Sequence, residues 1–264
     1  MLEMNSGGFD TDIDVRHIAP TVCRLLGTSA PDECEVDFIP EVVKSLSSRP
    51  RIALIVIDAV GLSTIKLHRE NAPFLMRAID EHFLALSSVF PPITPVNFAS
   101  MATGVSPVMH SIRNREETVI QDTLFDSLRR GGRMSCVCAR ENSTLNLLLS
   151  SKADERAISR RNKDTEIVLE AEAMFERCIP DFCWVQLLDM DDAQHKFGVI
   201  NPSAGKALAK LDENLKHLCE ILQELEYGII ICADHGQHDG KDNTGGIHDG
   251  TSSEDVEIPL TWME

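Results

Sequence analysis

Apolar runs that end at a carboxylate recur along the chain. Residues 51–58 form a continuous run rich in β-branched side chains and end at an aspartate, and residues 183–189 and 227–234 repeat the pattern. Residues 133–139 are a fourth candidate strand and residues 83–89 a weaker fifth, although neither run ends at a carboxylate. Such runs are typical of strands that are buried on both faces of a sheet. In these sheets, ligands bind outside the carboxyl ends of the strands.

Amphipathic stretches lie between these runs. Residues 123–130, 165–178 and 202–225 carry apolar side chains at three- and four-residue spacing, which predicts helices. Strands that alternate with helices indicate a three-layer α/β sandwich, with a mostly parallel sheet covered by helices on both faces. Residues 150–163 are the most polar passage, and we expect a short surface excursion there.

Composition and charge narrow the classes of function. An apolar fraction of 43% over 264 residues supports a large core and excludes global disorder. No repeat or linker is visible, so residues 1–264 are predicted to form one domain without a separate cap. A formal net charge of -17 argues against a nucleic-acid duplex or an anionic membrane as partner. It does not exclude a small phosphate ester, because bound cations dominate the local field.

We expect neither a secretory leader nor a membrane span in this sequence. Residues 1–14 lack the apolar core of a secretory leader, and no apolar run reaches the roughly 18 residues of a membrane span. A cytoplasmic protein is therefore expected. The eight cysteines include no CxxC pair, and their closest spacing is Cys136-x-Cys138. We interpret them as reduced, buried thiols.

Candidate metal ligands are concentrated in four short segments. They offer three carboxylates, three imidazoles and one hydroxyl, from Asp58, Thr94, Asp191, His195, Asp234, His235 and His248. Hard oxygen donors and borderline nitrogen donors in this ratio suit two divalent cations. A hydroxyl beside two cations is an activated nucleophile. The pattern predicts a two-metal site for phosphoryl transfer.

The hydroxyl of Thr94 has two interpretations. Threonine at the N-cap with Pro95 at the first helical position is an ordinary helix start for residues 96–103. Alternatively, the helix N-terminus presents free N–H groups and a positive dipole end to a phosphate. Taken alone, the Thr-Pro pair does not decide between these interpretations.

The carboxylate and imidazole pairs have stronger contexts. Asp191 and His195 are four residues apart, which places both on one face of a helical turn. Asp234 and His235 directly follow an apolar run, where an unpaired carboxylate would be costly to bury. A solvated acidic turn remains the alternative for Asp191.

Glycines surround the last candidate ligand. His248 lies in residues 245–250, where glycines allow the backbone to bend closely around a ligand. His238 is interpreted as a surface histidine. The same interpretation applies to four histidines without a matching carboxylate, which are His17, His68, His82 and His217.

The order of these motifs resembles the alkaline phosphatase superfamily. Strand-Asp, a threonine in a proline-rich loop, Asp-x-x-x-His, Asp-His-Gly and a final histidine follow one another as in that superfamily. Residues 90–104, with Pro107 and residues 110–112, are most similar to the nucleotide pyrophosphatase/phosphodiesterase branch. The resemblance covers residues 51–262 with gaps.

The resemblance implies a division of the ligands between two metals. One metal would be held by Asp191, His195 and His248, and the other by Asp58, Asp234 and His235, with Thr94 as nucleophile. Two dications, three carboxylates and an alkoxide make this site nearly neutral before substrate enters. Zinc suits the ligand set, and manganese would fit it less tightly.

A sulfatase, which shares this fold, does not fit. The formylglycine motif of sulfatases requires cysteine or serine, with proline two residues later and arginine four residues later. Here Thr94 is followed by Val96 and Phe98 at those positions.

Two departures from the diesterase branch concern the substrate. Ser111 replaces a glycine of that branch, and Arg115, with Asn114 just before it, stands where the branch has a phosphate-binding asparagine. An arginine fork suits a dianionic monoester, so monoester and diester substrates both stay open. Gln194 stands where the family usually has glycine.

Three functions are compatible with this site. The leading hypothesis is a phosphohydrolase with a covalent phospho-threonine intermediate. A phosphomutase of the same superfamily is the second, although the segment between Arg115 and Trp184 leaves little room for a cap domain. A non-catalytic metal-binding protein is the third. The oligomeric state is not predicted.

The amino-terminal segment resembles the other end of the family. Residues 14–27 are similar to a helix that follows the last metal histidine and the last strand in those proteins, whereas this sequence stops at residues 256–264. We infer a circular permutation, which is tolerated where termini lie close together. Residues 18–26 are then expected to pack beside the strand that ends the chain. The alternative is a chance match of one amphipathic helix.

Overall fold

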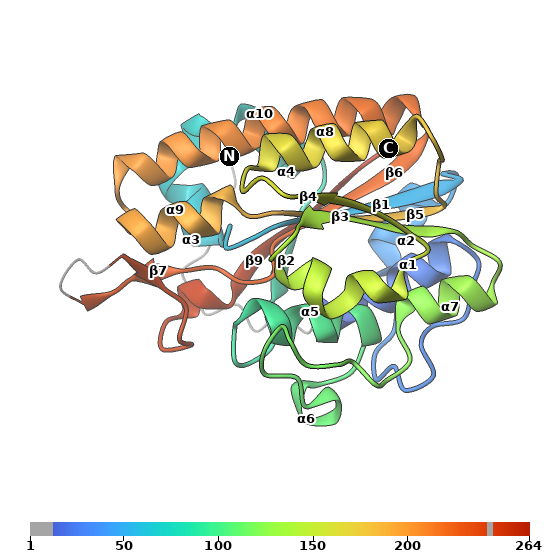
Figure 1. The fold of residues 1–264 in the computed structure, drawn as a ribbon. Helices are drawn as coiled ribbons and strands as arrows, with labels where there is room; N and C mark the ends of the chain where they lie inside the picture. The colour runs from blue at the N-terminus through green and yellow to red at the C-terminus, as the bar shows by residue number, and fades with distance from the viewer. Residues whose placement is uncertain (1–12, 242–244) are drawn as a thin grey trace.

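The chain folds around a seven-stranded sheet between two layers of helices (Figure 1). The structure is a computed structural model, and it describes residues 13–241 and 245–264. The strand order is β2-β9-β6-β1-β5-β3-β4, and β9 runs antiparallel to both of its neighbours. In chain order the strands are β1 (Arg51–Ile57), β2 (Leu84–Ser87), β3 (Ser135–Arg140), β4 (Glu155–Ser159), β5 (Phe182–Leu187), β6 (Tyr227–Cys232) and β9 (Glu257–Met263). The predicted mostly parallel sheet and the five predicted strands are confirmed.

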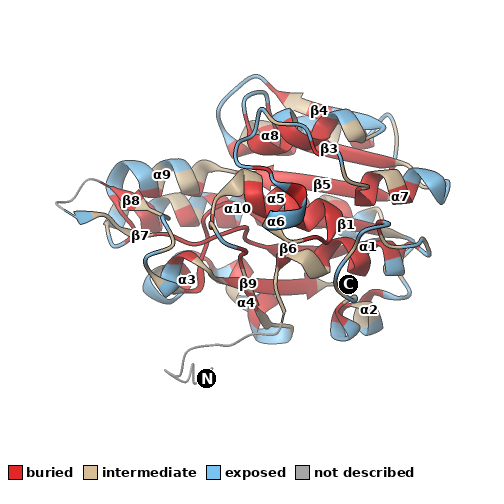
Figure 2. Cartoon of the chain, turned by 90° about the horizontal axis from the view of Figure 1, so that it is seen from below, coloured by how far each residue is buried: buried red, intermediate tan, exposed pale blue. Residues whose placement is uncertain are grey.

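The three strands at the centre of the sheet are the longest apolar runs of the sequence. β1 lies between β5 and β6, and Leu54 is in register with Trp184 on one side and Ile230 on the other. Nearly every residue of these strands is buried (Figure 2). Because both faces are covered, both faces are apolar, as the sequence pattern predicts.

Helices cover the sheet on both sides (Figure 1). One layer contains α4 (Pro73–Glu81), α8 (Asp164–Phe175), α9 (Asp189–Phe197) and α10 (Pro202–Glu224). The other contains α1 (Ile18–Leu25), α5 (Thr94–Thr103) and α7 (Leu124–Arg130). Further helices are α2 (Pro40–Leu46), α3 (Leu62–His68) and α6 (Pro107–His110), and a small hairpin pairs β7 (His238–Asp239) with β8 (Gly246–Ile247). The three predicted helices are confirmed, with ends that differ by up to three residues.

The polar passage at residues 150–163 is not a surface excursion. It contains β4, which pairs in parallel with β3 at the edge of the sheet. Only Ala157 and Ser159 of this strand are buried. An edge strand that buries one face carries polar residues on the other, so its sequence lacks the apolar run of a central strand.

The packing of the amino-terminal helix also differs from the prediction. α1 packs on α2, α5 and α7 rather than beside β9. The first described residues pair with β2, the strand next to β9: the Ser87 N–H donates to the Ile13 carbonyl at 3.1 Å, and Asp14 forms a bridge to Ser87. The inferred circular permutation stays a prediction.

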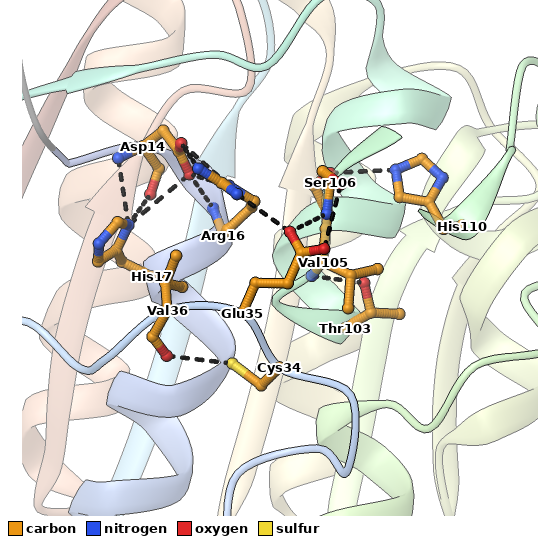
Figure 3. A network of polar contacts seen from close by, with 11 residues as sticks. Asp14, Arg16, His17, Cys34, Glu35, Val36, Thr103, Val105, Ser106 and His110 are labelled. Carbon is orange, nitrogen blue, oxygen red and sulfur yellow. Dashed lines mark hydrogen bonds and ion pairs between the residues drawn. The ribbon is translucent and has the colours of Figure 1, made fainter. Parts of the chain in front are cut away.

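Glu35, in the segment that follows α1, forms hydrogen bonds at the carboxyl end of α5 (Figure 3). The Glu35 carboxylate accepts the backbone N–H of Ser106 at 2.9 Å, its hydroxyl at 3.2 Å, and the Arg16 guanidinium at 3.1 Å. The Glu35 N–H donates to the Gly104 carbonyl at 3.0 Å. Gly104 has a φ of 74°, and a Cβ there would lie 2.4 Å from the Cys34 sulfur. A glycine is therefore required where α5 ends.

His110 stabilises the turn beyond α5 through hydrogen bonds at both ring nitrogens. Figure 3 shows its position in that turn. The Ser100 hydroxyl donates to the Val105 carbonyl at 2.9 Å, so it accepts from His110 Nε2 at 3.1 Å. His110 Nδ1 in turn accepts the N–H of Ile112 at 3.0 Å. Burial, with the charge of Arg113, lowers the pKa of His110 to about 4. Protonation would convert the Nδ1 acceptor into a donor and break this arrangement.

This histidine makes stability depend on pH. Since its folded-state pKa lies below the ordinary value, its contribution is present above about pH 6.5 and is lost as the pH falls toward the folded-state pKa. His110→Gln removes the titrating group and keeps an N–H for Ser100. We expect the free energy of unfolding, measured with urea, to fall less between neutral pH and about pH 4.5 in this variant than in the wild type. Equal falls would contradict the assignment, and His217→Gln, on the exposed side of α10, is the control.

Two further sequence predictions concern the whole chain. The eight cysteines are free; Cys34 and Cys178 are half-buried and the other six are buried. Within residues 13–241 and 245–264, no helix is long and apolar enough to cross a bilayer. Most of residues 1–14, on which the expectation about a secretory leader rests, lie outside the described residues.

Candidate metal centre

The predicted ligands meet at the carboxyl edge of the three central strands. Asp58 directly follows β1, and Asp234 lies two residues beyond β6. Asp191 and His195 lie on α9, which follows β5. Since β1, β5 and β6 are adjacent and parallel, their carboxyl ends bring these side chains to one place.

The first ligand group is Asp191, His195 and His248. One donor atom from each lies within 4.8 Å of the others. His195 Nε2 is 3.2 Å from Asp191 Oδ1 and 3.3 Å from His248 Nε2. As predicted from their four-residue spacing, Asp191 and His195 lie on the same face of a helical turn. The His195 side chain is 43% exposed, so this group faces solvent.

The second ligand group is Asp58, Asp234 and His235, and it is fully enclosed. His235 Nε2 is 3.5 Å from Asp58 Oδ1 and 3.4 Å from Asp234 Oδ2. The Thr94 hydroxyl lies 3.2 Å from the same nitrogen. The rings of His235 and His248 stack with centroids 4.0 Å apart, so the two groups adjoin.

His195, His235 and His248 all direct Nε2 toward the candidate metal centre. Each Nδ1 faces a backbone carbonyl: that of Gly246 at 2.9 Å from His195, of Gly236 at 3.1 Å from His235, and of Pro92 at 2.8 Å from His248. A carbonyl accepts but cannot donate, so each Nδ1 carries the proton and each Nε2 offers a lone pair. Metal-binding histidines are oriented in this way.

The carboxylates also fit a pair of cations. Asp58 Oδ1 and Asp234 Oδ2 are buried and have no hydrogen-bond partner among the described residues. Burial, together with the charges of Asp234 and Asp191, raises the pKa of Asp58 well above its usual value. Buried carboxylates that repel one another are stable when a metal joins them. The residues present therefore fit two divalent ions.

Two glutamines that the sequence analysis missed hold the carboxylates in place. Gln186 Nε2 donates to Asp58 Oδ2 at 2.7 Å, and Gln237 Nε2 donates to Asp191 Oδ1 at 2.6 Å. The bond from Gln186 leaves Asp58 Oδ1, the oxygen near His235, free for a cation, and the bond from Gln237 orients the Asp191 carboxylate. Gln186 could have been found from the sequence, because it is the one polar side chain inside an apolar run that was predicted to be buried.

Helix α9 is anchored by a buried guanidinium at the end of β3. Arg140 donates to Asp164 at 2.9 Å, to Asp189 at 2.7 Å and to Asp192 at 2.6 Å. Asp164 also accepts the N–H groups of Leu188 and Asp189, at 2.8 and 2.9 Å. Burial raises the pKa of Asp164 to about 6. This network fixes the turn that presents the first ligand group.

The backbone around the site is unusually close-packed. A Cβ at Gly245 would lie 1.9 Å from the His195 carbonyl oxygen, and one at Gly246 would lie 2.3 Å from Gln237 Oε1. The glycines before His248 thus let the loop pass against α9. Ala59, next to a ligand, has a φ of 63°, a strained conformation of the kind found at functional sites.

Thr94 is not the N-cap of its helix. The N-cap is Ile93, and Thr94 occupies the first helical position. The N–H groups of Val96 and Asn97 donate to the Ile93 carbonyl at 3.1 Å, and Pro95 has no N–H. The helix end therefore offers a phosphate fewer N–H donors than the Thr-Pro motif suggests. The group that Thr94 contributes to the site is its hydroxyl.

The predicted substrate residues are placed in the loop beyond α6. The Asn114 amide donates to Glu117 at 2.7 Å, and the Arg115 guanidinium donates to the Asn142 carbonyl at 2.8 Å. Both residues are exposed. Their role in binding phosphate stays a prediction.

Two residues near the ligands have different surroundings from those expected. His238 is half-buried rather than a surface histidine, because its Nδ1 pairs with the buried Asp255 carboxylate at 2.7 Å. Gln194, the departure from the family pattern, is buried and donates to the Thr64 hydroxyl at 2.8 Å.

Several solved structures share this fold. The periplasmic domain of the phosphoethanolamine transferase EptC from Campylobacter jejuni has a TM-score of 0.62 and 12% identity, covering 81% of this chain and 79% of that one. Murine ectonucleotide pyrophosphatase/phosphodiesterase 5 has a TM-score of 0.61 and 14% identity, covering 73% and 58%. Phosphonoacetate hydrolase from Sinorhizobium meliloti has a TM-score of 0.55 and 20% identity, covering 72% and 57%. The chain thus spans less than two thirds of the latter two proteins.

A family model extends the comparison to sequence. The model of type I phosphodiesterase / nucleotide pyrophosphatase matches residues 52–118 and 138–259, which include all seven predicted ligands. The comparison with curated proteins gives no match. The matched residues make up most of the chain. The chain therefore belongs to the type I phosphodiesterase / nucleotide pyrophosphatase family.

Proposed function

We propose that this protein hydrolyses small phosphate esters through a covalent phospho-threonine intermediate at a centre of two divalent cations. The observation that carries the proposal is the position of the Thr94 hydroxyl. It lies 3.2 Å from His235 Nε2, in the second ligand group, and that group adjoins the first through the stacked rings of His235 and His248.

The two ligand groups define where the cations would bind. Asp191, His195 and His248 would hold one, and Asp58, Asp234 and His235 the other. Three imidazoles and three carboxylates suit zinc. When bound, the cations supply positive charge that favours deprotonation of the threonine hydroxyl and stabilises the leaving oxygen.

The chain's own residues then account for the steps of the reaction. The Thr94 oxygen attacks phosphorus, a new O–P bond forms, and the ester P–O bond breaks and releases the alcohol, which gains a proton from water. Water next attacks the same phosphorus and breaks the threonine O–P bond. This step regenerates the hydroxyl and releases phosphate from a monoester, or a phosphate monoester from a diester.

The arrangement of the middle of the chain favours hydrolysis over a mutase reaction. Residues 124–175 form α7, β3, β4, α8 and two short helical turns. β3 and β4 belong to the sheet, and α7 and α8 belong to the helical layers that cover it. None of these four elements can therefore form a cap domain that excludes water from the site. The site is open to solvent on the side of His195, so water can reach the phospho-threonine intermediate.

The family and the charge of the chain support the proposed substrate class. Structures of murine ectonucleotide pyrophosphatase/phosphodiesterase 5 include a complex with AMP. For a chain with a formal net charge of -17, cations at the centre are needed to attract a phosphate ester. We propose a small phosphate ester rather than a nucleic-acid duplex.

A comparison of two model substrates tests the proposal. Nitrophenyl phosphate and bis-nitrophenyl phosphate are supplied to the metal-free protein reconstituted with zinc or manganese. We expect release of nitrophenol from at least one ester with zinc and no release before metal is added. If neither ester is hydrolysed with either metal, the proposed function is wrong.

A variant of Arg115 tests whether this residue favours monoesters over diesters. A guanidinium pairs with both oxygens of a dianionic monoester but with one charge of a diester. We therefore expect Arg115→Ala to lower kcat/KM for the monoester about tenfold more than for the diester. Steady-state kinetics on both substrates measure this ratio. The neighbouring exposed Arg113, as Arg113→Ala, is the control, and equal losses on both esters would remove the role given to Arg115.

A further inference from the structure

Three cysteine thiols meet in the core, away from the catalytic centre. Cys136 and Cys138 are two residues apart on β3, so their side chains share one face of the sheet. Cys183 on β5 is the register partner of Cys136. The three sulfurs lie within 4.8 Å of one another, and those of Cys138 and Cys183 are 3.7 Å apart. We name these three residues the trithiol cluster.

The trithiol cluster is sealed from solvent. Phe182 and Trp184, on either side of Cys183, contact Phe125 of α7, so Cys183 points to the opposite face of the sheet. α8 packs on β3 from that side (Figure 1). Each of the three cysteines is 0% exposed. Apart from its first residue, the buried side chains of α8 are apolar: Ile167, Val168, Ala171, Met174 and Phe175.

We propose that the trithiol cluster binds one thiophilic metal ion, Zn²⁺ or Cu⁺, through its three sulfurs. Thiolate ligands select these ions over the hard cations that carboxylates bind. A metal–sulfur distance of about 2.3 Å places two sulfurs of one tetrahedral ion about 3.8 Å apart. The observed separation of 3.7 Å between Cys138 and Cys183 fits this geometry, and the other two sulfur pairs lie within 4.8 Å. None of the three sulfurs is in a disulfide.

The burial of the cluster also bears on what it can hold. Sulfur ligands of a metal are thiolates, and a thiolate without solvent contact is costly unless a positive charge pairs with it. A bound metal ion supplies that charge.

The proposed site is distinct from the catalytic centre in chemistry and in loading. The two catalytic ligand groups contain oxygen and nitrogen donors and no sulfur. Because the cluster has no exposed atom, we expect its ion to enter while the chain folds, and the bound ion then stabilises the fold.

Charge-transfer absorption tests the proposal directly. The protein is unfolded with a reductant and a chelator, refolded with Cd²⁺ in place of Zn²⁺ or with Cu⁺, and freed of excess metal. Thiolate ligands give a sulfur-to-metal charge-transfer band, whereas oxygen and nitrogen ligands give none. We expect one band that saturates at one ion per chain, and whichever ion gives it identifies the class. No band with either ion overturns the proposal.

Two variants locate the band. Cys138→Ala removes the sulfur that both other thiols contact, and we expect it to abolish the band and to lower the metal content by one ion per chain. Cys219→Ala, a buried cysteine of α10 outside the cluster, is the matched control and is expected to keep both. A band that survives in folded Cys138→Ala overturns the assignment. If Cys138→Ala does not fold, the presence or absence of the charge-transfer band in the wild-type protein tests the proposal. Neither result depends on hydrolytic activity, so a failure here is separate from a failure of the proposed function.

Discussion

Thr94→Ala is expected to lower kcat by about three orders of magnitude or more while both metal ions stay bound. The hydroxyl is the proposed nucleophile, and six other side chains remain to hold the cations. Turnover of nitrophenyl esters and elemental analysis of the same sample measure the two quantities. An unchanged kcat would reject the nucleophile assignment.

Thr94→Ser provides the matched control. Serine keeps the hydroxyl and removes one methyl group, so we expect it to retain much of the activity that alanine loses. In the wild type and in Thr94→Ser, mass spectrometry after an acid quench should detect a phosphorylated peptide that contains position 94. Loss of activity in both variants, without loss of metal, would indicate that the methyl group or helix packing matters and not the hydroxyl.

Asp234→Asn is expected to have opposite effects on metal binding and on stability. The second ligand group loses a charged oxygen, so affinity for one metal should fall by at least about a hundredfold, and activity should fall with it. Without metal, the same change removes one of the two neighbouring charges that, in addition to burial, raise the pKa of Asp58. We therefore expect the metal-free variant to be about 1 kcal/mol more stable than the metal-free wild type.

Two measurements check this pair of effects. Elemental analysis gives the number of ions per chain, and urea unfolding in a chelator gives the free energy of unfolding. Asp80→Asn, at an exposed position of α4, is the control and should change neither. A metal-free Asp234→Asn chain that is less stable than the wild type would show that the carboxylate has a structural role that outweighs repulsion.

The ligands could be predicted from the sequence because each one follows a recognisable element. Asp58 and Asp234 come at the ends of apolar runs, and Asp191 and His195 share one helical turn. A parallel sheet brings such positions to one edge, so the predicted fold and the predicted site support each other. The order of the motifs then pointed to the family that the family model confirms.

Other features depend on contacts between distant segments and have no local pattern. The carbonyls that orient the three histidines come from loops, and any residue could supply them. β4 was not predicted because an edge strand that buries one face lacks a continuous apolar run. The position of α1 was predicted wrongly because its packing partners, α2, α5 and α7, come from distant parts of the sequence. Gln186 is the exception, since a lone polar residue in a buried strand is a readable signal.

An anomalous diffraction map collected at the zinc absorption edge tests the central claim most directly. For crystals grown with zinc, the account predicts one peak among Asp191, His195 and His248 and a second among Asp58, Asp234 and His235, with the Thr94 oxygen beside the second. A map without peaks in these two places, or with the threonine oxygen turned away from both, would contradict it.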